Sequence, residues 1–161
     1  MSMVNNQKSK VIIYTDGGSR GNPGPAAIGI IADLRGLNTD LNGLNTDQHR
    51  LKEYSKFLGT ATNNEAEYQA IIFALKKIKQ LIGKEKAKKT EIEIRSDSEL
   101  VVNQLNGNYK IKEQDLVPFF IEIWNLKQDF GKVNFVQIPR EENKKADLLV
   151  NRELNNQSKL F

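Results

Sequence analysis

Apolar residues recur along this chain with two different periods, and these periods predict both strands and helices. Five short segments are rich in β-branched and aromatic residues, and we expect them to be strands: residues 10–14, 26–32, 51–59, 91–96 and 133–138. The first three follow one another with no helical segment between them, which is typical of an antiparallel meander. Helical segments separate the others, so the chain is expected to form a mixed α/β sheet with helices on both faces.

The helix predicted after the third strand has the clearest start signal. Its first residues, TNNE at 62–65, have the form of a capping box, in which Thr62 is the N-cap and Glu65 reaches back to the Thr62 amide. Apolar residues then follow at helical spacing: Ala66, Ala70, Ile71, Ala74, Leu75, Ile78 and Ile82. Three further helices are expected over residues 98–105, over about 114–130, and from near Asn143.

Composition places the chain among globular proteins of one domain. Its 161 residues suit a single domain over 1–161, with a core at about 10–155 and polar tails at 1–9 and 156–161. With no cysteine, disulfides and thiolate metal sites are excluded. Because no apolar run reaches membrane-spanning length and no signal peptide is recognisable, we expect a cytoplasmic protein that does not enter a membrane. No obligatory protein partner is implied, so we expect a monomer. The net charge of +4 slightly favours polyanionic partners.

Residues 33–50 are polar and contain a short duplication, GLNTD at 36–40 and again at 43–47. The repeat is too short for a solenoid, so we expect an enlarged, exposed hairpin loop. His49, the only histidine, lies at the end of this segment. It has neither a cysteine nor a second histidine nearby, and we therefore interpret it as a solvated loop residue.

Four carboxylates occupy positions where structure alone does not call for one. Asp16 and Asp97 terminate predicted strands, and ligands of sheets with parallel strands lie beyond the carboxyl ends of the strands. Glu67 shares a helix face with alanine and isoleucine, and Asp147 shares one with alanine, valine and leucine, so both charges are expected to face the core. Asp16 is also followed by four glycines and two prolines in residues 17–25, which suits close approach of a ligand to the main chain.

Each acid alone has an ordinary alternative explanation. Asp16 could begin a simple hairpin turn, Asp97 could be a helix N-cap, Glu67 could extend to solvent, and Asp147 could pair with a neighbouring cation. Together, however, converging acids repel, since two unit charges ~4 Å apart interact by about 4 kcal/mol at an effective dielectric of 20. Such a cluster needs protonation or a cation. Because all the ligands are oxygens, Mg²⁺ or Mn²⁺ is favoured over zinc.

Four segments in order resemble type 1 ribonuclease H: TDGGSRGNPGP at 15–25, TNNEAE at 62–67, SDS at 96–98, and Asn143 with Ala146-Asp147. The resemblance extends from about Lys10 to Glu153. It implies the ribonuclease H-like fold, with a five-stranded mixed sheet whose first three strands are antiparallel. It further implies hydrolysis of the RNA strand of RNA–DNA hybrids by two divalent ions, Mg²⁺ with Mn²⁺ as a substitute, giving 5′-phosphate and 3′-hydroxyl ends.

The same resemblance implies roles for individual residues. The metal-binding acids are Asp16, Glu67, Asp97 and Asp147. The residues that line the 2′-hydroxyls and minor groove of the RNA strand are Ser19, Asn22, Asn63, Asn64 and Glu99. Thr62 matches a DNA-phosphate contact, although its N-cap role is a sufficient structural reason for it.

The chain resembles the compact members of the family, without a hybrid-binding domain or a long basic protrusion. The connection at 107–112 is short, so Tyr109 and two lysines would have to hold the hybrid, and a solvated loop is an almost equal alternative. The loop before Asp147 has no histidine. Arg140 is the cation there, and it could hold a phosphate through paired hydrogen bonds or could form a surface ion pair with Glu141 or Glu142.

Three other functional classes remain open from the sequence. One is a catalytically weak nucleic-acid-binding module, which the presence of all four acids disfavours. Another is a nuclease of the same fold with a different substrate, as in resolvases and integrases, which the TNN and GNPG motifs disfavour. A purely structural protein is the least favoured, because it leaves Glu67 and Asp147 without a reason.

Overall fold

The five strands form one sheet in the order β3-β2-β1-β4-β5 in the computed structural model, which describes residues 8–37 and 50–159. Their bounds are β1 (Ser9–Ser19), β2 (Gly24–Asp33), β3 (Leu51–Ala61), β4 (Thr90–Ser96) and β5 (Lys132–Gln137). The pairs β1–β2 and β2–β3 are antiparallel, whereas β1–β4 and β4–β5 are parallel. The predicted mixed sheet with an antiparallel first half is confirmed.

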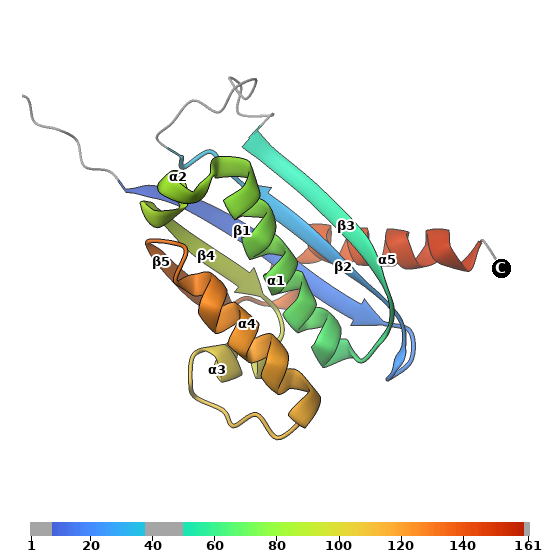
Figure 1. Cartoon of the computed structure of the whole chain (residues 1–161). Coiled ribbons are helices and arrows are strands. Elements are labelled where there is room, and N and C mark those ends of the chain that lie inside the picture. Colours follow the sequence, from blue (N-terminus) through green and yellow to red (C-terminus); the bar gives the residue numbers. More distant parts are fainter. Residues whose placement is uncertain (1–7, 38–49, 160–161) are drawn as a thin grey trace, which may run out of the picture.

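Helices cover both faces of this sheet, as predicted (Figure 1). The α-helices are α1 (Asn63–Ile82), α2 (Lys84–Lys88), α3 (Glu99–Leu105), α4 (Val117–Lys127) and α5 (Lys144–Ser158). Two short 3₁₀ turns, η2 (Gln114–Leu116) and η3 (Arg140–Glu142), precede α4 and α5. Helix α1 packs along β1 and β2, with α4 beside it, while α5 crosses the opposite face over β2. None of the helices in the described ranges is long and apolar enough to span a lipid bilayer.

The larger core lies between the sheet and α1. Val11 and Ile13 of β1, fully excluded from solvent, meet Ile71 and Leu75 of α1 in a single apolar cluster. The opposite face has a thinner core of small side chains against α5, where Ala27 packs on Val150 and Leu154. Tyr14 of β1 packs against Ala146 and Leu149 of α5, so β1 contributes side chains to both cores.

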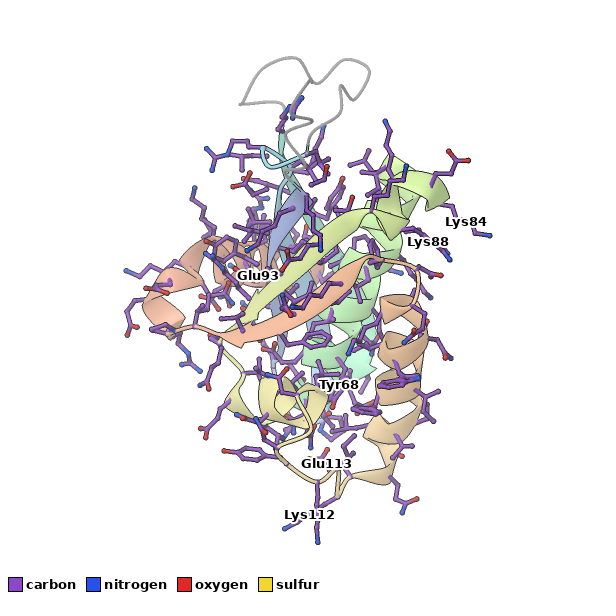
Figure 2. All side chains as sticks on the ribbon, turned by 90° about the vertical axis from the view of Figure 1, so that its left-hand side faces the viewer. Tyr68, Lys84, Lys88, Glu93, Lys112 and Glu113 are labelled. Atoms are coloured by element: carbon purple, nitrogen blue, oxygen red, sulfur yellow. The ribbon has the colours of Figure 1, made fainter. Side chains whose placement is uncertain are left out.

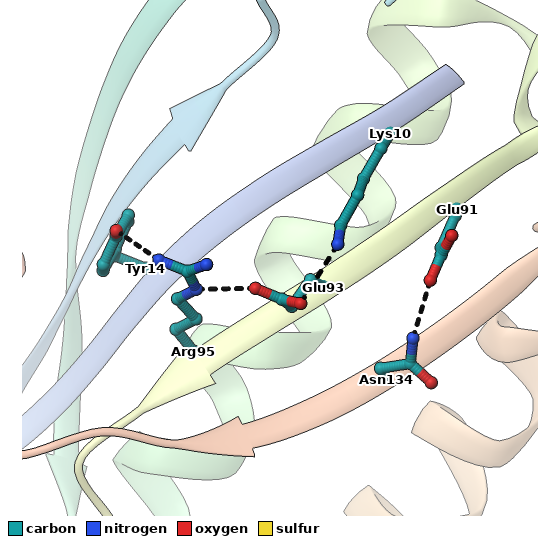
Figure 3. Close-up of polar contacts among 6 residues, drawn as sticks. All are labelled: Lys10, Tyr14, Glu91, Glu93, Arg95 and Asn134. Atoms are coloured by element: carbon teal, nitrogen blue, oxygen red, sulfur yellow. Dashed lines mark hydrogen bonds and ion pairs between the residues drawn. The ribbon is translucent and has the colours of Figure 1, made fainter. Parts of the chain in front are cut away.

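The parallel half of the sheet carries a row of charged groups on the face away from α1 (Figure 3). Glu93 accepts from Lys10 at 3.3 Å and from the Arg95 Nε at 2.6 Å, and an Arg95 Nη donates to the Tyr14 hydroxyl at 2.7 Å. Burial alone would raise the pKa of Glu93, but the hydrogen bonds from Arg95 and Lys10 hold that pKa below its ordinary value. These pairs let this part of the sheet face solvent without a covering helix.

Strand β1 is longer than predicted. Its parallel pairing with β4 ends at Tyr14–Arg95, but its antiparallel pairing with β2 continues to Ser19–Ala26. The alternative in which Asp16 begins a simple hairpin turn is therefore wrong, because β2 supplies ladder partners to Asp16 and to the glycines that follow it. Asp16 nevertheless lies past the end of the parallel ladder, where β1 and β4 no longer pair.

Local signals account for most helix boundaries. The capping box is present, since the Thr62 hydroxyl accepts from the Glu65 amide at 3.1 Å and the Glu65 carboxylate accepts from the Thr62 amide. The single helix expected over 114–130 is instead η2 followed by α4, with Pro118 in the first turn of α4.

Helix α2 was not predicted, and α5 continues to Ser158 into the expected polar tail. His49 and most of the predicted enlarged loop lie outside the described residues.

Two glycines on the α5 face provide a test of this packing. A Cβ at Gly29 would lie 2.3 Å from the Ala146 carbonyl oxygen, whereas a Cβ at Gly18 would meet only a Val150 methyl at 3.2 Å. We expect Gly29→Ala to lower the free energy of unfolding by about 1–3 kcal/mol or more, because backbone cannot move aside. Gly18→Ala should cost less than about 1 kcal/mol, since one side chain can shift. Urea denaturation of both variants measures this, and equal small losses would contradict the packing.

Candidate active site

Three carboxylates from separate elements meet at the end of the parallel ladder. Asp16 comes from β1, Glu67 from the first turns of α1, and Asp97 from the residue after β4. Each offers an oxygen within 4.8 Å of the other two. Asp16 and Glu67 are 6% and 8% exposed, values at which an unpaired charge is costly. The structure thus brings together three of the four acids that the sequence singled out.

A glycine sets the distance between β1 and α1 at this point. A Cβ on Gly17 would lie 2.3 Å from the backbone carbon and oxygen of Ala66, the residue before Glu67. Only glycine therefore lets α1 approach closely enough to place Glu67 beside Asp16. The sequence suggested that glycines here admit a ligand to the main chain; at Gly17, the neighbour that needs the space is the backbone of α1.

Asp97 does not cap α3, because its neighbour Ser98 does so, and the Asp97 carboxylate can therefore take part in the acid cluster. The N-cap of α3 is Ser98, whose hydroxyl accepts from the Val101 amide at 3.3 Å. The simple N-cap explanation of Asp97 is therefore wrong. The Ser96 hydroxyl links the turn at Asp97 to Glu67. It accepts from the Ser98 amide at 3.1 Å and lies 3.5 Å from a Glu67 carboxylate oxygen.

Asp147 reaches the same cleft from α5 but is exposed. The expectation that it faces the core is wrong, because the buried side of α5 consists of Ala146, Leu149, Val150 and Leu154, and Asp147 lies at the margin of that side. The position of α5 depends on Asn143, which is 1% exposed and donates from Nδ2 to the Thr15 carbonyl at 2.9 Å. This bond ties the start of α5 to the residue before Asp16.

Arg140 lies in η3 at the edge of the cleft. Its Nε is 3.7 Å from an Asp97 carboxylate oxygen, so its ion pair is with Asp97 rather than with Glu141 or Glu142. The Arg140 side chain is 89% exposed, and exposed pairs of this kind contribute at most about 1 kcal/mol. The guanidinium can therefore exchange this partner for an incoming anion at small cost.

Burial and mutual repulsion dominate the electrostatics of the cleft. Burial raises the pKa of Asp16 to about 7; a hydrogen bond with Glu67 opposes that rise, and the charges of Asp97 and Asp147 add to it. Burial also raises the pKa of Glu67 well above its ordinary value, with the charge of Asp16 adding to the effect. A bound cation would relieve this repulsion, and a cluster made only of carboxylate oxygens suits Mg²⁺ or Mn²⁺.

The cleft that holds the acids has a volume of about 480 Å³. Asp16, Glu67, Asp97, Asp147 and Arg140 all line it, and so do Ser19, Asn63 and Asn64. Asn22 adjoins them, because its side-chain oxygen accepts from the Asn63 amide at 3.1 Å. In turn, Asn63 accepts from the Ser19 amide at 2.9 Å. The turn after β1 and the start of α1 thus form one hydrogen-bonded wall.

The remaining candidates lie beside this cleft rather than in it. The Tyr109 hydroxyl donates to Glu99 at 2.8 Å, and Tyr109 lines an adjoining pocket of about 440 Å³. Thr62 performs its N-cap role at the start of α1. Connection 107–112 is hydrogen-bonded to α3, while all of its residues except the half-buried Ile111 are exposed to solvent.

Comparison with known proteins decides the family. A family model described as reverse transcriptase-like matches residues 15–153. A ribonuclease H1 isolated from compost by a metagenomic approach is 42% identical and superposes with a TM-score of 0.77, over 92% of this chain and 98% of its own. The ribonuclease H1 of Halobacterium salinarum is 33% identical with a TM-score of 0.75, over 91% and 98%. This chain belongs to the type 1 ribonuclease H family.

Some family members are longer proteins. A bifunctional protein of Mycobacterium tuberculosis is 37% identical over 142 residues, which are 88% of this chain but 35% of that protein. The chain thus spans about a third of the length of its mycobacterial relatives. It spans 65% of the curated Halobacterium ribonuclease HI.

Sequence reasoning missed two buried polar side chains next to this ribonuclease H site, Tyr68 and Gln104. The Tyr68 hydroxyl donates to the Gln104 side-chain oxygen at 2.8 Å, and the two residues are 0% and 4% exposed. Both occupy positions that helical spacing assigns to the core, where a tyrosine reads as one more apolar side chain. A glutamine on the apolar face of α3 was the available signal.

The repulsion among the acids predicts an effect on stability in the absence of metal. Folding raises the pKa of Asp16 from 3.8 to about 7, so the folded state binds more protons than the unfolded state, and stability falls as pH rises through that window. We expect Asp97→Asn to remove part of this penalty. With a chelator present, its Tm should rise by about 2–4 °C near pH 8 and by less near pH 5.

Thermal unfolding of Asp97→Asn and of a control, Asp115→Asn, measures this effect. Asp115 is an exposed acid in η2, so the control changes the charge equally away from the cleft. An equal Tm change in both variants, or a gain that does not grow with pH, would contradict mutual repulsion as its cause.

Proposed function

We propose that this protein is an endoribonuclease that hydrolyses the RNA strand of RNA–DNA hybrids. The observation that carries the proposal is the set of Asp16, Glu67 and Asp97, whose carboxylate oxygens lie within 4.8 Å of one another in a cleft of the ribonuclease H fold. A relative that is 42% identical has been crystallised in complex with an RNA/DNA hybrid, over 91% of this chain and with a TM-score of 0.76. The expected products carry 5′-phosphate and 3′-hydroxyl ends.

The proposed cofactor is a pair of Mg²⁺ ions, for which Mn²⁺ can substitute. The donor set fits such ions, because it consists of carboxylate oxygens whose repulsion a cation relieves. Asp16, Glu67, Asp97 and Asp147 would hold them, with Asp16 between the others because it lies on the central strand. When bound, the ions would activate a water molecule and stabilise the departing 3′ oxygen in an in-line displacement.

The protein's own side chains would select and orient the hybrid. Hydrogen-bonding groups in the turn after β1 and at the start of α1 would contact the 2′-hydroxyls of the RNA strand, which distinguish RNA from DNA. We assign this role to Ser19, Asn22, Asn63, Asn64 and Glu99. Tyr109 and its neighbouring lysines would contact the hybrid beside the cleft, and Thr62 would contact a DNA phosphate next to the helix that it caps.

We also propose that the chain acts as a single ribonuclease H domain, as a monomer, in the cytoplasm. The cytoplasmic location is compatible with the absence of cysteine, because a chain without disulfides does not need an oxidising compartment. Sedimentation at several protein concentrations tests the monomer, and a dimer at micromolar concentration would contradict it.

Cleavage of matched substrates tests the activity. Labelled RNA–DNA hybrid, double-stranded RNA and double-stranded DNA of the same sequence are incubated side by side with Mg²⁺ and, separately, with Mn²⁺. Cleavage of the hybrid alone, in its RNA strand, is the expected result. Hybrid binding without cleavage would leave a nucleic-acid-binding module as the better account, and cleavage of either other duplex would indicate a different substrate.

Two neighbouring glutamates provide a sharp internal comparison. Glu67→Gln removes a charge from the buried cluster, so we expect turnover to fall by about 100-fold or more. Glu65→Gln keeps the capping-box geometry, since a glutamine oxygen can accept the same amide hydrogen bond, and it should retain most of the activity. Initial rates on the hybrid measure both variants. Similar losses in the two would show that the cluster is not the catalytic centre.

Arg140 is proposed to hold a phosphate of the RNA strand near the acids. Its exposed guanidinium lies at the mouth of the cleft, where its partner Asp97 is also a proposed metal ligand. If Asp97 held a cation, the exposed guanidinium would be available for paired hydrogen bonds with a phosphate. An arginine keeps its proton at any working pH, so it does not act as a base.

Arg140→Ala should therefore lower turnover on the hybrid by about tenfold or more while changing the Tm by less than about 1 °C. Because an arginine does not titrate in this range, the ratio of wild-type to Arg140→Ala turnover should show no step between about pH 6 and 7, where a histidine would titrate. The matched control is Arg152→Ala, which removes an exposed arginine from α5 outside the lining of the cleft. Full turnover in Arg140→Ala would contradict the phosphate-holding role and would leave an ordinary surface ion pair as the better explanation of Arg140.

A further inference from the structure

Two hydrogen bonds, one buried and one partly buried, link α1, α3 and residues 107–113, which form the connection after α3 and are called connection 107–113 below. The Tyr68 hydroxyl on α1 donates to the side-chain oxygen of Gln104 on α3 at 2.8 Å. The Gln104 amide nitrogen in turn donates to the backbone carbonyl of Lys110 at 3.2 Å. Gln104 is 4% exposed and Tyr68 is fully excluded from solvent. The core of the protein thus reaches the backbone of connection 107–113 through two side chains.

This arrangement is not needed for packing. The surrounding cluster between the sheet and α1 is otherwise apolar, and a leucine or phenylalanine pair would fill the same space without the cost of burying polar atoms. What the polar pair adds is direction, because the Gln104 amide nitrogen finds its acceptor only when connection 107–113 places the Lys110 carbonyl within reach, while Tyr68 holds the other end of the Gln104 amide. The pair therefore specifies the position of this segment.

Bonds at its surface join the same segment to candidate substrate residues. Tyr109 donates to Glu99, as described above, and the Asn64 side-chain nitrogen donates to Glu113 at 3.1 Å. The backbone amides of residues 108 and 109 both donate to the Asn103 carbonyl, at 2.8 and 3.2 Å. Connection 107–113 thus spans from the start of α3 to the start of α1, and these two helix starts flank the cleft.

The segment also presents two basic side chains, Lys110 and Lys112, beside the cleft. Tyr109, Lys110 and Lys112 line the adjoining pocket of about 440 Å³, together with Gln104. Figure 2 shows Lys112 pointing outward at the lower end of the molecule, next to Glu113, with Tyr68 above them. Burial raises the pKa of Tyr68 to about 12, with the charge of Glu113 adding to the effect, so the hydroxyl keeps its proton and remains a donor near neutral pH.

We propose that Tyr68 and Gln104 are positioning residues for hybrid binding, which fix connection 107–113 so that Tyr109, Lys110 and Lys112 meet the substrate without first being ordered. This role rests on the proposed function. A segment already held in its binding position avoids the entropy cost of ordering on association, so losing the hold weakens binding. The acids of the cleft are untouched, and the chemical step should therefore proceed at its usual rate.

Two variants separate this role from simple packing. Tyr68→Phe removes only the hydroxyl, and Gln104→Met keeps the length of the side chain without its polar atoms. We expect each to raise KM for the hybrid about fivefold and to leave kcat within about twofold. The matched control is Tyr54→Phe, which removes a hydroxyl from a tyrosine on β3 whose ring packs against Phe73. Its KM and kcat should both be unchanged.

Hydrogen exchange supplies a readout that does not depend on cleavage. In both variants, the amides of residues 107–113 should exchange faster than in the wild-type protein, while those of β1 and β4 should not. The Kd for the hybrid, measured by fluorescence anisotropy with Mg²⁺ in an Asp97→Asn background, should rise by the same factor as KM. Unchanged exchange, or faster exchange with an unchanged Kd, would overturn the positioning role.

The result also separates this inference from the proposed function. If the wild-type protein binds the hybrid without cutting it, the proposed activity fails, and exchange and Kd still decide the role of Tyr68 and Gln104. If the wild-type protein cuts the hybrid and both variants match it in KM, the inference alone fails. A fall in kcat at constant KM would assign the two residues to the stability of the catalytic cleft instead, and would also overturn the inference.

Discussion

The unequal pairing of β1 with its two neighbours is the constraint from which the site follows. Backbone hydrogen bonds hold β1 to β2 as far as Ser19, but they hold it to β4 only as far as Tyr14. Beyond Tyr14 the two strands no longer pair, and β4 ends at Ser96. Just past this point the carboxylates of Asp16, on β1, and Asp97, after β4, come close together. Gly17 then admits the backbone of α1, which delivers Glu67 to the same point.

The site is costly to the fold that builds it. At an effective dielectric of 20, two carboxylates 4.8 Å apart repel by about 3.5 kcal/mol when both are charged, a large fraction of the stability of a typical domain. The apolar core between α1 and the sheet, with Tyr68, Ile71 and Leu75 fully or almost fully excluded from solvent, offsets this cost. The same helix therefore supplies both a destabilising acid and the contacts that compensate for it, on adjacent turns.

Local chemistry made much of this predictable from the sequence. In α1 the sequence distinguished two neighbouring glutamates. Glu65 lies three residues after the N-cap, the position of a capping box, whereas Glu67 falls on the buried face that the 3.6-residue period defines. Both signals depend only on residues a few positions away. The extent of β1 was not predictable in this way, since it depends on ladder partners in β2 that propensity does not describe. Asp147 was placed wrongly on the core side, because a helical wheel does not show where the covered surface ends. The cap of α3 was ambiguous between Asp97 and Ser98, two adjacent residues that both suit an N-cap.

Two buried side-chain amides perform the same task beside the cleft, and the backbone groups to which they bond were not predictable from the sequence. Asn143 donates to the Thr15 carbonyl and fixes the start of α5 next to Asp16, while Gln104 donates to the Lys110 carbonyl and fixes the connection that carries Tyr109. In each case a side chain satisfies a backbone group of another segment, which a ladder or a helix would otherwise do. Regular structure cannot place these segments, because η3 and connection 107–113 lack repeating backbone bonds to the sheet. A directional bond from the buried interior is the means by which irregular segments acquire the fixed positions that a binding site requires.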